Sequence, residues 1–414
     1  MKKLLALSAI VLSLTTFASC DKLDGEKPVD PGDNTFVPID LTKAELDVAI
    51  GANAFAFDVY RALYEEKQML VSPFSLSLAL SMTACGAAGN TAAEMSSTLG
   101  FKGFSTEDVA SYYNKMVTSL ATIDALTTFE SANSIWIDKN FSVKKDFLSM
   151  TEDYFAAEEK SVSFMDPSTV EAINKWCSDK THEKIEKMLD GIDPRTVMAL
   201  INALYFNGRW GVEFNDKTQK EKFTTIDGKE VKVDMMSTEH MLNYSSVDGW
   251  SLVGLPYGNG AFQMDVILPP ADMPFKEAVE SFDSDLWTSL SGRSSACMTN
   301  VKMPEFKFEY EVEGLPKVLS ALGMKDAFTS AADFSRIADI HDGDSFYIGD
   351  VRQKTYIDVN TKGTEAAAVT IVQTFATAIG PGPREADFTA DRPFLFLIRE
   401  RSSNSILFIG QKVK

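Results

Sequence analysis

The sequence predicts a single large α+β domain behind a short leader, on three observations. Apolar residues recur at helical spacing over residues 44–66 and again over residues 76–85, so helices dominate the first part of the chain. Strand patterns dominate the middle and the end, at residues 251–268, 301–308 and 393–398. The 414 residues contain no internal repeat and only one linker-like stretch. One domain is therefore predicted rather than two or three.

The same patterns place the elements between these landmarks. Further helices are expected at residues 90–99, 109–126, 141–155, 168–180, 275–290 and 315–322. Strands are expected at residues 128–137, 162–164 and 197–206, and a hairpin turns at Asp227-Gly228. Residues 197–206 form a buried strand with one polar residue, Asn202, whose buried amide needs hydrogen-bond partners.

Residues 1–40 are predicted to be a leader and a tether. Two lysines precede an apolar run that is too short to span a bilayer, so residues 1–19 are interpreted as a signal peptide. Small residues directly before Cys20 resemble the acylation motif of bacterial lipoproteins, and an ordinary signal peptide is the alternative. The resemblance implies an acylated Cys20 on a flexible tether (20–40) and a folded domain (41–414). It also implies a lipid-anchored position at the outer membrane or cell surface of a Gram-negative bacterium.

Charge and composition argue against several classes of function. The net charge is −19, which disfavours nucleic acid and other polyanions as partners, because these need basic patches. Beyond Cys20 the chain has Cys85, Cys177 and Cys297, an odd number that cannot form a complete disulfide framework. The three histidines show no metal-ligand spacing, and no Gly-x-Ser-x-Gly motif is present. We therefore expect no metal, no cofactor and no enzyme activity.

Residues 358–379 are the stretch around which the chain is organised. After Glu365 they carry no charge, and at strand spacing one face has only small or β-branched side chains. Such a face fits between two existing strands without a large pocket. The glycines and prolines of residues 380–383 end the stretch in a loop. We predict a segment that can be an exposed loop or a central strand, and loop insertion into a sheet releases stored strain.

Both flanks of this stretch resemble one protein family. Six residues look like the proximal hinge of the reactive-centre loop of inhibitory serpins: Gly363, Thr364, Glu365, Ala366, Ala367 and Ala368. Residues 391–398 and 405–410 look like the C-terminal strands of that family. The resemblance implies a serpin fold with three β-sheets, about eight to nine helices and an exposed reactive-centre loop at residues 361–390.

The resemblance also implies roles for residues elsewhere in the chain. Ser72 and Ser75 match serines beneath the central sheet, where it must open. Ser72 before proline is also typical of a helix start, and both roles can hold together. Asn202 matches the same shutter network, and Trp210 matches the breach where the loop enters the sheet. Gln353 stands where many animal serpins have a shutter histidine, and its amide can bridge by hydrogen bonds instead.

An inhibitory serpin is a suicide inhibitor that offers a bait bond to its protease. At the family's usual spacing from Gly363 this bond is Thr377–Ala378, with the alternates Phe375, Ala376 and Ile379. The small residues suit elastase-like serine proteases, and subtilisin-like or papain-like enzymes more loosely. The expected partners are target proteases and, through Cys20, a membrane, and the expected state is a monomer. The few lysines of residues 109–126 argue against a glycosaminoglycan cofactor.

Two alternatives stay open. One is a non-inhibitory serpin that acts as a binding module, although such members usually have bulky, charged or proline residues in the hinge and this chain has alanines. The other is a surface glycan-binding lipoprotein, which leaves the hinge unexplained. Two departures from the family also bear on the interpretation. Thr361 stands where an acidic hinge residue is usual, and the segment from Gly363 to Pro393 is longer than in many relatives, so the register of the bait bond is open.

Overall fold

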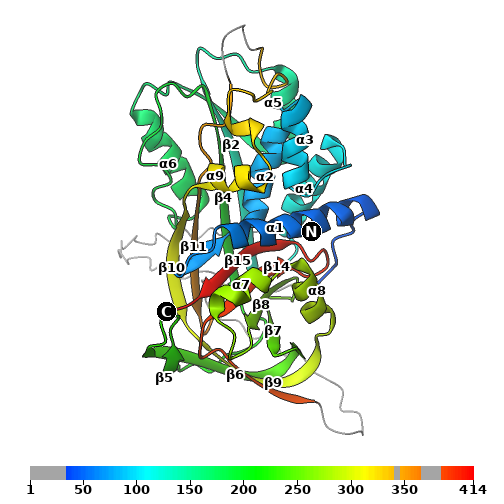
Figure 1. Cartoon of the computed structure of the whole chain (residues 1–414), viewed down its shortest axis with the longest axis vertical. Coiled ribbons are helices and arrows are strands. Elements are labelled where there is room, and N and C mark those ends of the chain that lie inside the picture. Colours follow the sequence, from blue (N-terminus) through cyan, green and yellow to red (C-terminus); the bar gives the residue numbers. More distant parts are fainter. Residues whose placement is uncertain (1–33, 340–345, 365–383) are drawn as a thin grey trace, which may run out of the picture. The chain divides into compact units, whose positions relative to one another are not determined.

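The computed structural model describes residues 34–339, 346–364 and 384–414 (Figure 1). The predicted lipid site at Cys20, the hinge residues 365–368 and the bait residues 375–379 lie outside the described residues. Within the described ranges, no helix is long and apolar enough to cross a lipid bilayer.

Nine α-helices lie in the described part of the chain, and several begin at side-chain caps. Thr42 and Ser105 each start a helix with a capping box, in which the cap side chain and the side chain three residues later bond each other's backbone amides. Ser72 starts another helix by accepting a hydrogen bond from Ser75 N. The helices are α1 (Lys43–Ala62), α2 (Pro73–Ala84), α3 (Gly89–Thr98), α4 (Thr106–Leu120), α5 (Lys145–Phe155), α6 (Ser168–Lys180), α7 (Phe275–Ser281), α8 (Ser284–Gly292) and α9 (Leu315–Leu322).

The single helix predicted for residues 275–290 is wrong, because the chain breaks between α7 and α8. Phe282 has extended backbone angles, and the Asp283 carboxylate accepts a hydrogen bond from Leu286 N at 2.9 Å, which starts a new helix. Helix α4 begins before residue 109, because Ser105 caps its start, and it ends at Leu120 rather than at residue 126.

Six strands form one sheet in the order β10-β11-β12-β4-β2-β3. Their bounds are β2 (Thr127–Asp138), β3 (Ala157–Val162), β4 (Met198–Arg209), β10 (Phe306–Val312), β11 (Gln353–Asn360) and β12 (Gly363–Thr364). The longest ladder joins β2 and β4, which are antiparallel and pair along nearly their whole length. The predicted strand at residues 197–206 is thus confirmed as an interior strand of a sheet.

The other strands pair in one continuous assembly that contains two sheets. They are β1 (Met69–Val71), β5 (Gln219–Thr224), β6 (Glu230–Val247), β7 (Trp250–Pro256), β8 (Phe262–Leu268), β9 (Ser295–Pro304), β13 (Glu385–Thr389), β14 (Phe394–Glu400) and β15 (Ile406–Lys412). The order is β1-β15-β14-β8-β7-β6-β9-β13, and β5 also pairs with β6. Strand β6 belongs to both sheets. Its end pairs with β7 in one sheet, and its middle pairs with β9 in the other. The predicted α+β fold with three sheets is confirmed.

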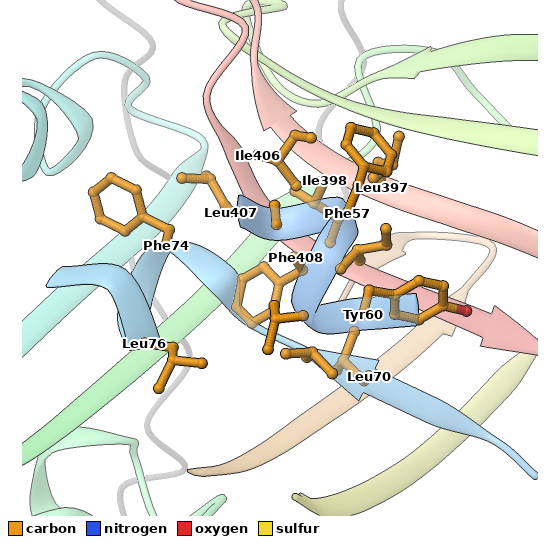
Figure 2. Close-up of a cluster of buried hydrophobic side chains, with 14 of the residues drawn as sticks. Phe57, Tyr60, Leu70, Phe74, Leu76, Leu397, Ile398, Ile406, Leu407 and Phe408 are labelled. Carbon is orange, nitrogen blue, oxygen red and sulfur yellow. The ribbon is translucent and has the colours of Figure 1, made fainter. Parts of the chain in front are cut away.

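The main core is built from segments far apart in the sequence. Figure 2 shows side chains of α1, α2, β1, β14 and β15 that point toward one another, among them Phe57, Leu70, Phe74 and Phe408. All residues of β14 and β15 are buried. Because burying one large apolar side chain contributes roughly 1.5–3 kcal/mol, the last strands of the chain are central to stability.

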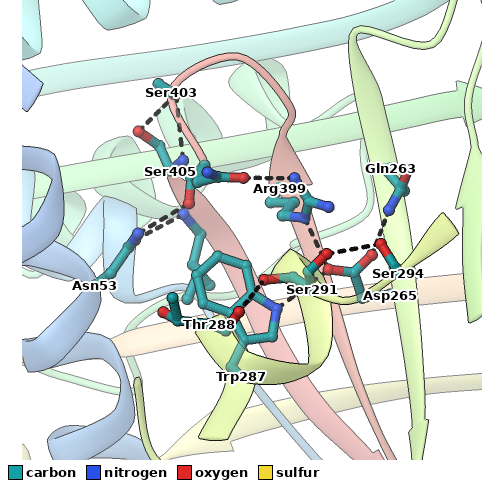
Figure 3. A network of polar contacts seen from close by, with 12 residues as sticks. Asn53, Gln263, Asp265, Trp287, Thr288, Ser291, Ser294, Arg399, Ser403 and Ser405 are labelled. Atoms are coloured by element: carbon teal, nitrogen blue, oxygen red, sulfur yellow. Dashed lines mark hydrogen bonds and ion pairs between the residues drawn. The ribbon is translucent and has the colours of Figure 1, made fainter. Parts of the chain in front are cut away.

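A buried polar network holds the turn between β14 and β15 (Figure 3). Arg399 Nε lies 2.7 Å from Asp265 Oδ2, and the two side chains are 9% and 0% exposed. Asp265 also accepts a hydrogen bond from Trp287 Nε1 at 3.2 Å, and Arg399 Nη1 donates to Asn404 Oδ1 at 2.7 Å. These additional hydrogen bonds satisfy a charge pair that would otherwise be costly to bury.

Residues 34–40, which their composition assigned to the tether, lie against the folded body. Asn34 Nδ2 donates to Asp124 Oδ1 at 2.9 Å, and Asn34 Oδ1 accepts from Ala125 N at 2.9 Å. Ile39 N donates to Ser402 Oγ at 2.9 Å. These contacts give the segment before α1 a structural role that its sequence did not indicate.

Candidate functional site

The short strand β12 lies between β11 and β4 in the six-stranded sheet. Gly363 pairs with Asn360 of β11 on one side and with Arg209 of β4 on the other, and β12 is antiparallel to both neighbours. Adjacent strands lie about 4.8 Å apart, so β12 separates β4 and β11 by about 9–10 Å at this end. The first two residues of the predicted hinge are therefore already strand residues inside the sheet.

Beyond β12, β4 and β11 turn facing edges toward each other, which we define as residues 198–207 and residues 353–358. Residues 198–207 pair with β2, and residues 353–358 pair with β10. In the part of the chain that the structure describes, no ladder joins β4 directly to β11. A strand that continued β12 in the same direction would lie between β4 and β11, where its backbone groups could pair with both strands, and paired backbone groups are strongly preferred to unpaired ones in a sheet.

Gly363 must be glycine because of both its backbone angle and its close neighbours. Its φ is +147°, a conformation that residues with a side chain rarely adopt. A Cβ atom at this position would lie 2.2 Å from Gly208 O. Gly208 is restricted in turn, since its own Cβ would lie 2.8 Å from the Tyr257 ring. The two glycines allow the hinge and β4 to approach each other closely.

Trp210 and Tyr257 form the wall beside the hinge. Their rings stack with centroids 4.5 Å apart and an interplanar angle of 13°. Trp210 Nε1 donates to Asn360 O at 2.9 Å, and Trp210 N donates to Lys362 O at 3.2 Å. Tyr257 OH lies 2.7 Å from Thr364 Oγ1, and its complete burial raises the pKa of the phenol well above its usual range. The phenol is therefore neutral and can share a hydrogen bond with the hinge threonine.

Ser72 and Gln353 meet beneath β11 through two hydrogen bonds. Ser72 N donates to Gln353 Oε1 at 2.8 Å, and Gln353 Nε2 donates to Ser72 O at 2.8 Å. Ser72 Oγ donates to Leu407 O at 2.8 Å, which fixes the start of α2 on β15. Both residues are buried, so the glutamine amide satisfies the buried Ser72 N and adds a second hydrogen bond to Ser72 O, which also accepts from Leu76 N at 3.1 Å.

A second chain of hydrogen bonds links α2 to β4 and β2. Ser75 Oγ bonds to Asn202 Oδ1, and Asn202 Nδ2 donates to Asn133 Oδ1 at 2.7 Å. Asn133 Nδ2 then donates to Phe155 O at 2.7 Å. Asn202 of β4 and Gln353 of β11 are thus both linked to the start of α2. The start of α2 therefore makes side-chain hydrogen bonds to both β4 and β11, which no ladder joins directly in the described residues.

The structure brings together most of the residues that the sequence singled out. Gly363 and Thr364 lie beside Trp210, while Ser72, Ser75, Asn202 and Gln353 converge on the start of α2. The remaining hinge residues (Glu365, Ala366, Ala367, Ala368), the bait residues (Phe375, Ala376, Thr377, Ala378, Ile379) and Cys20 lie outside the described residues. No cluster of metal-ligating side chains is found in the described ranges.

Three residues of the site were not identified from the sequence: Asn133, Tyr257 and Glu305. Asn133 could have been found, because a second amide in a predicted strand needs a buried partner just as Asn202 does. It lies directly opposite Asn202 in the β2–β4 ladder. Tyr257 and Glu305 gave no such signal, since their hinge contacts depend on which strands become neighbours.

Known proteins resemble this chain along most of its length. The family model "Serpin (serine protease inhibitor)" matches residues 51–414. Iripin-2 of Ixodes ricinus is 32% identical over 381 residues, which cover 90% of this chain and 92% of that protein. Leukocyte elastase inhibitor of Sus scrofa is 31% identical, over 86% of this chain and 96% of that protein. The crystal structure of tengpin, a thermophilic serpin, in the native state matches with a TM-score of 0.80 at 32% identity, over 91% of this chain and 96% of that one. The chain therefore belongs to the serpin family.

Proposed function

We propose that the protein is an inhibitory serpin, a suicide inhibitor that traps its target protease covalently. The observation that carries this proposal is β12, because the first hinge residues already pair with both β4 and β11. After Glu365 the hinge residues are three alanines, whose small side chains can continue β12 along the facing edges without a large pocket.

The proposed reaction begins as ordinary proteolysis of the bond Thr377–Ala378. The protease nucleophile attacks the carbonyl carbon of Thr377, the bond to the Ala378 nitrogen breaks, and that amine leaves with a proton. Thr377 is then held as an acyl-enzyme, while residues from Ala378 onward stay with the body through β13. The freed hinge extends β12 between the facing edges. The new strand gains backbone hydrogen bonds and carries the protease away before water can hydrolyse the ester.

The network at the start of α2 would allow this extension. Ser75 holds Asn202 of β4, and Ser72 holds Gln353 of β11, so each strand has its own polar contact with the helix. A strand that enters between β4 and β11 could therefore extend while Ser75 and Ser72 keep their separate contacts with the two strands. The uninserted state must be metastable, so its lifetime depends on kinetic stability.

Elastase-like serine proteases are the proposed targets. Ala376, Thr377 and Ala378 present only small side chains to the shallow pockets of such enzymes. A relative is named leukocyte elastase inhibitor, which supports the same class. Subtilisin-like serine proteases and papain-like cysteine proteases are further candidates, because they also accept small residues.

We further propose that the inhibitor is a monomeric bacterial lipoprotein. An acylated Cys20 would anchor it to the outer membrane or cell surface of a Gram-negative bacterium, since two or more acyl chains give stable attachment. Its targets would then be proteases that reach that membrane. Growth with labelled fatty acid and intact mass of the purified chain would test the lipidation, and an unlabelled chain that keeps residues 1–19 would contradict it.

The test of inhibition is incubation of the full-length chain, purified in detergent, with pancreatic elastase. A complex that survives denaturing electrophoresis, with release of a fragment that begins at Ala378, is the expected result. Thr364→Arg should convert the inhibitor into a substrate, because it places a charge in the buried β12 site beside Tyr257. Thr224→Arg, at an exposed position of β5, is the matched control. Cleavage without complex by elastase, subtilisin, chymotrypsin and papain would refute the proposal and favour a non-inhibitory serpin.

A further inference from the structure

Thr361 lacks the acidic side chain that is usual at its position in serpins, yet a carboxylate lies beside it. Thr361 N donates a hydrogen bond to Glu305 Oε1 at 3.2 Å. Glu305 belongs to the junction between β9 and β10, and its own amide donates to Asp234 O of β6 at 2.8 Å. The carboxylate is therefore presented from a fixed point of the fold.

Contacts hold the turn before β12 from two sides. On the β4 side, Trp210 binds the carbonyl groups of Asn360 and Lys362. Inside the turn, Asn360 Oδ1 accepts a hydrogen bond from Lys362 N at 2.9 Å. On the β10 side, Glu305 takes the amide of Thr361. Removal of Glu305 would remove the side-chain contact of the turn on the β10 side, where only the β10–β11 ladder, which ends at Val359, would remain.

We propose that Glu305 is the positioning residue of the hinge and replaces the acid that position 361 lacks. This inference rests on the proposed function and identifies a residue that sets how efficiently the protein traps its protease. Glu305 keeps residues 361–362 in the turn that starts β12, so that the hinge is aligned with the facing edges when the bait bond is cut.

The direction of the effect follows from the pairing already present. Gly363 and Thr364 are strand residues before any further insertion, so the turn that precedes them need not move as the strand lengthens. Fixing that turn therefore favours insertion over hydrolysis of the acyl-enzyme. Without Glu305 a larger share of the inhibitor is cleaved as a substrate. A hydrogen bond to a partly buried carboxylate corresponds to roughly a fivefold change in the ratio of trapped to released protease.

The same geometry predicts that the usual family residue would be harmful here. Thr361→Glu would bring a second carboxylate close to Glu305, because the backbone of residue 361 already contacts that side chain. Like charges at such a distance repel each other. Thr361→Glu should therefore lower trapping in this chain, although it restores the residue that other serpins have.

The experiment compares the full-length chain with Glu305→Ala, Glu305→Gln and Thr361→Glu, with Glu309→Ala as the matched control. Glu309 is an exposed carboxylate of β10 that pairs with Lys354 at 3.7 Å. The first readout is amide hydrogen exchange in peptides that cover residues 361–364. The second is the ratio of covalent complex to cleaved inhibitor with elastase. Glu305→Gln keeps an acceptor oxygen and should retain much of both.

The expected result is faster exchange at residues 361–364 and roughly fivefold less complex for Glu305→Ala, with no change for Glu309→Ala. Unchanged exchange in Glu305→Ala would overturn the inference, and so would faster exchange with an unchanged ratio. If the unmodified chain trapped no protease, the proposed function would fail, and the role of Glu305 in trapping would fail with it. The exchange readout would still decide separately whether Glu305 holds the turn.

Discussion

Replacement of Gly363 by alanine should disable the hinge and leave the rest of the fold intact. At φ +147° the added methyl group would lie 2.2 Å from Gly208 O. Gly228→Ala is the matched control, since Gly228 has φ +77° and no atom lies within 4 Å of the place that its methyl group would occupy. The control contains the backbone strain alone, whereas Gly363→Ala contains the strain and the collision.

The size of the two effects can be worked from the structure. Alanine near the αL region, as at Gly228, costs about 1–2 kcal/mol, which should lower the unfolding temperature of Gly228→Ala by no more than a few degrees. At φ +147° the backbone strain of Gly363→Ala is at least as large. At position 363 the methyl group and the carbonyl oxygen must also separate by about 1 Å to reach an ordinary contact distance. A backbone hydrogen bond stretched by that amount is lost. Gly363→Ala should therefore lose the pairing of β12, and the structure gives the core no reason to change.

The assay is the ratio of covalent complex to cleaved inhibitor, measured with elastase alongside thermal unfolding. Gly363→Ala should lower this ratio at least tenfold, a difference of about 1.4 kcal/mol between the competing barriers, and Gly228→Ala should leave it unchanged. Normal trapping by Gly363→Ala would refute the argument that β12 is the start of insertion.

Three further predictions concern the body of the protein. Asp265→Ala should lower the free energy of unfolding by about 3–5 kcal/mol in denaturant titrations, because it leaves Arg399 buried without its counter-charge. Gln353→Leu should destabilise the protein by about 1–3 kcal/mol in the same titrations, because the buried Ser72 N loses its partner while Ser72 O keeps only the hydrogen bond from Leu76 N. Burial lowers the pKa of the Lys412 ammonium to about 8. The folded state then releases this proton more readily than the unfolded state, so stability should rise between about pH 8 and pH 10. Lys412→Met should remove that rise and increase the unfolding temperature at pH 7.

Clear outcomes would contradict each of these predictions. Asp265→Ala and Arg399→Met should be compared, because removal of the cation leaves a fully buried carboxylate and should be at least as harmful. Equal stability of all three proteins would mean that the network in Figure 3 contributes nothing. Gln353→His is the control for the amide bridge, since it keeps one donor or acceptor. A stability curve for Lys412→Met parallel to that of the unmodified chain would show that another group titrates.

The sequence predicts the fold and the hinge because their signals are local. A glycine, a threonine and three alanines stand close together at 363–368, and the single amide of Asn202 within an apolar strand indicates a network by its chemistry alone. The break between α7 and α8 was also local, but the cap of Asp283 was hidden by apolar residues that continue at helical spacing. A prediction based on apolar periodicity alone misses a capping residue that lies inside such a run.

The contacts of Glu305 and Tyr257 could not be predicted for a different reason. Glu305 binds a residue 56 positions away, and Tyr257 binds one 107 positions away. Both contacts exist only because β12 lies between β4 and β11, and no local pattern states which strands become neighbours. Thr361 gave the one hint, since a missing acid at the hinge implies a substitute elsewhere, but it does not say where.

The central claim is that the hinge inserts between residues 198–207 and residues 353–358 after the bait bond is cut. Amide hydrogen exchange of these two segments, before and after cleavage of the full-length chain in its loop, tests the claim most directly. Cleavage should strongly slow exchange in both segments and leave the β14–β15 pair unchanged. Equal exchange before and after cleavage would contradict the claim, because the facing edges would have gained no partner.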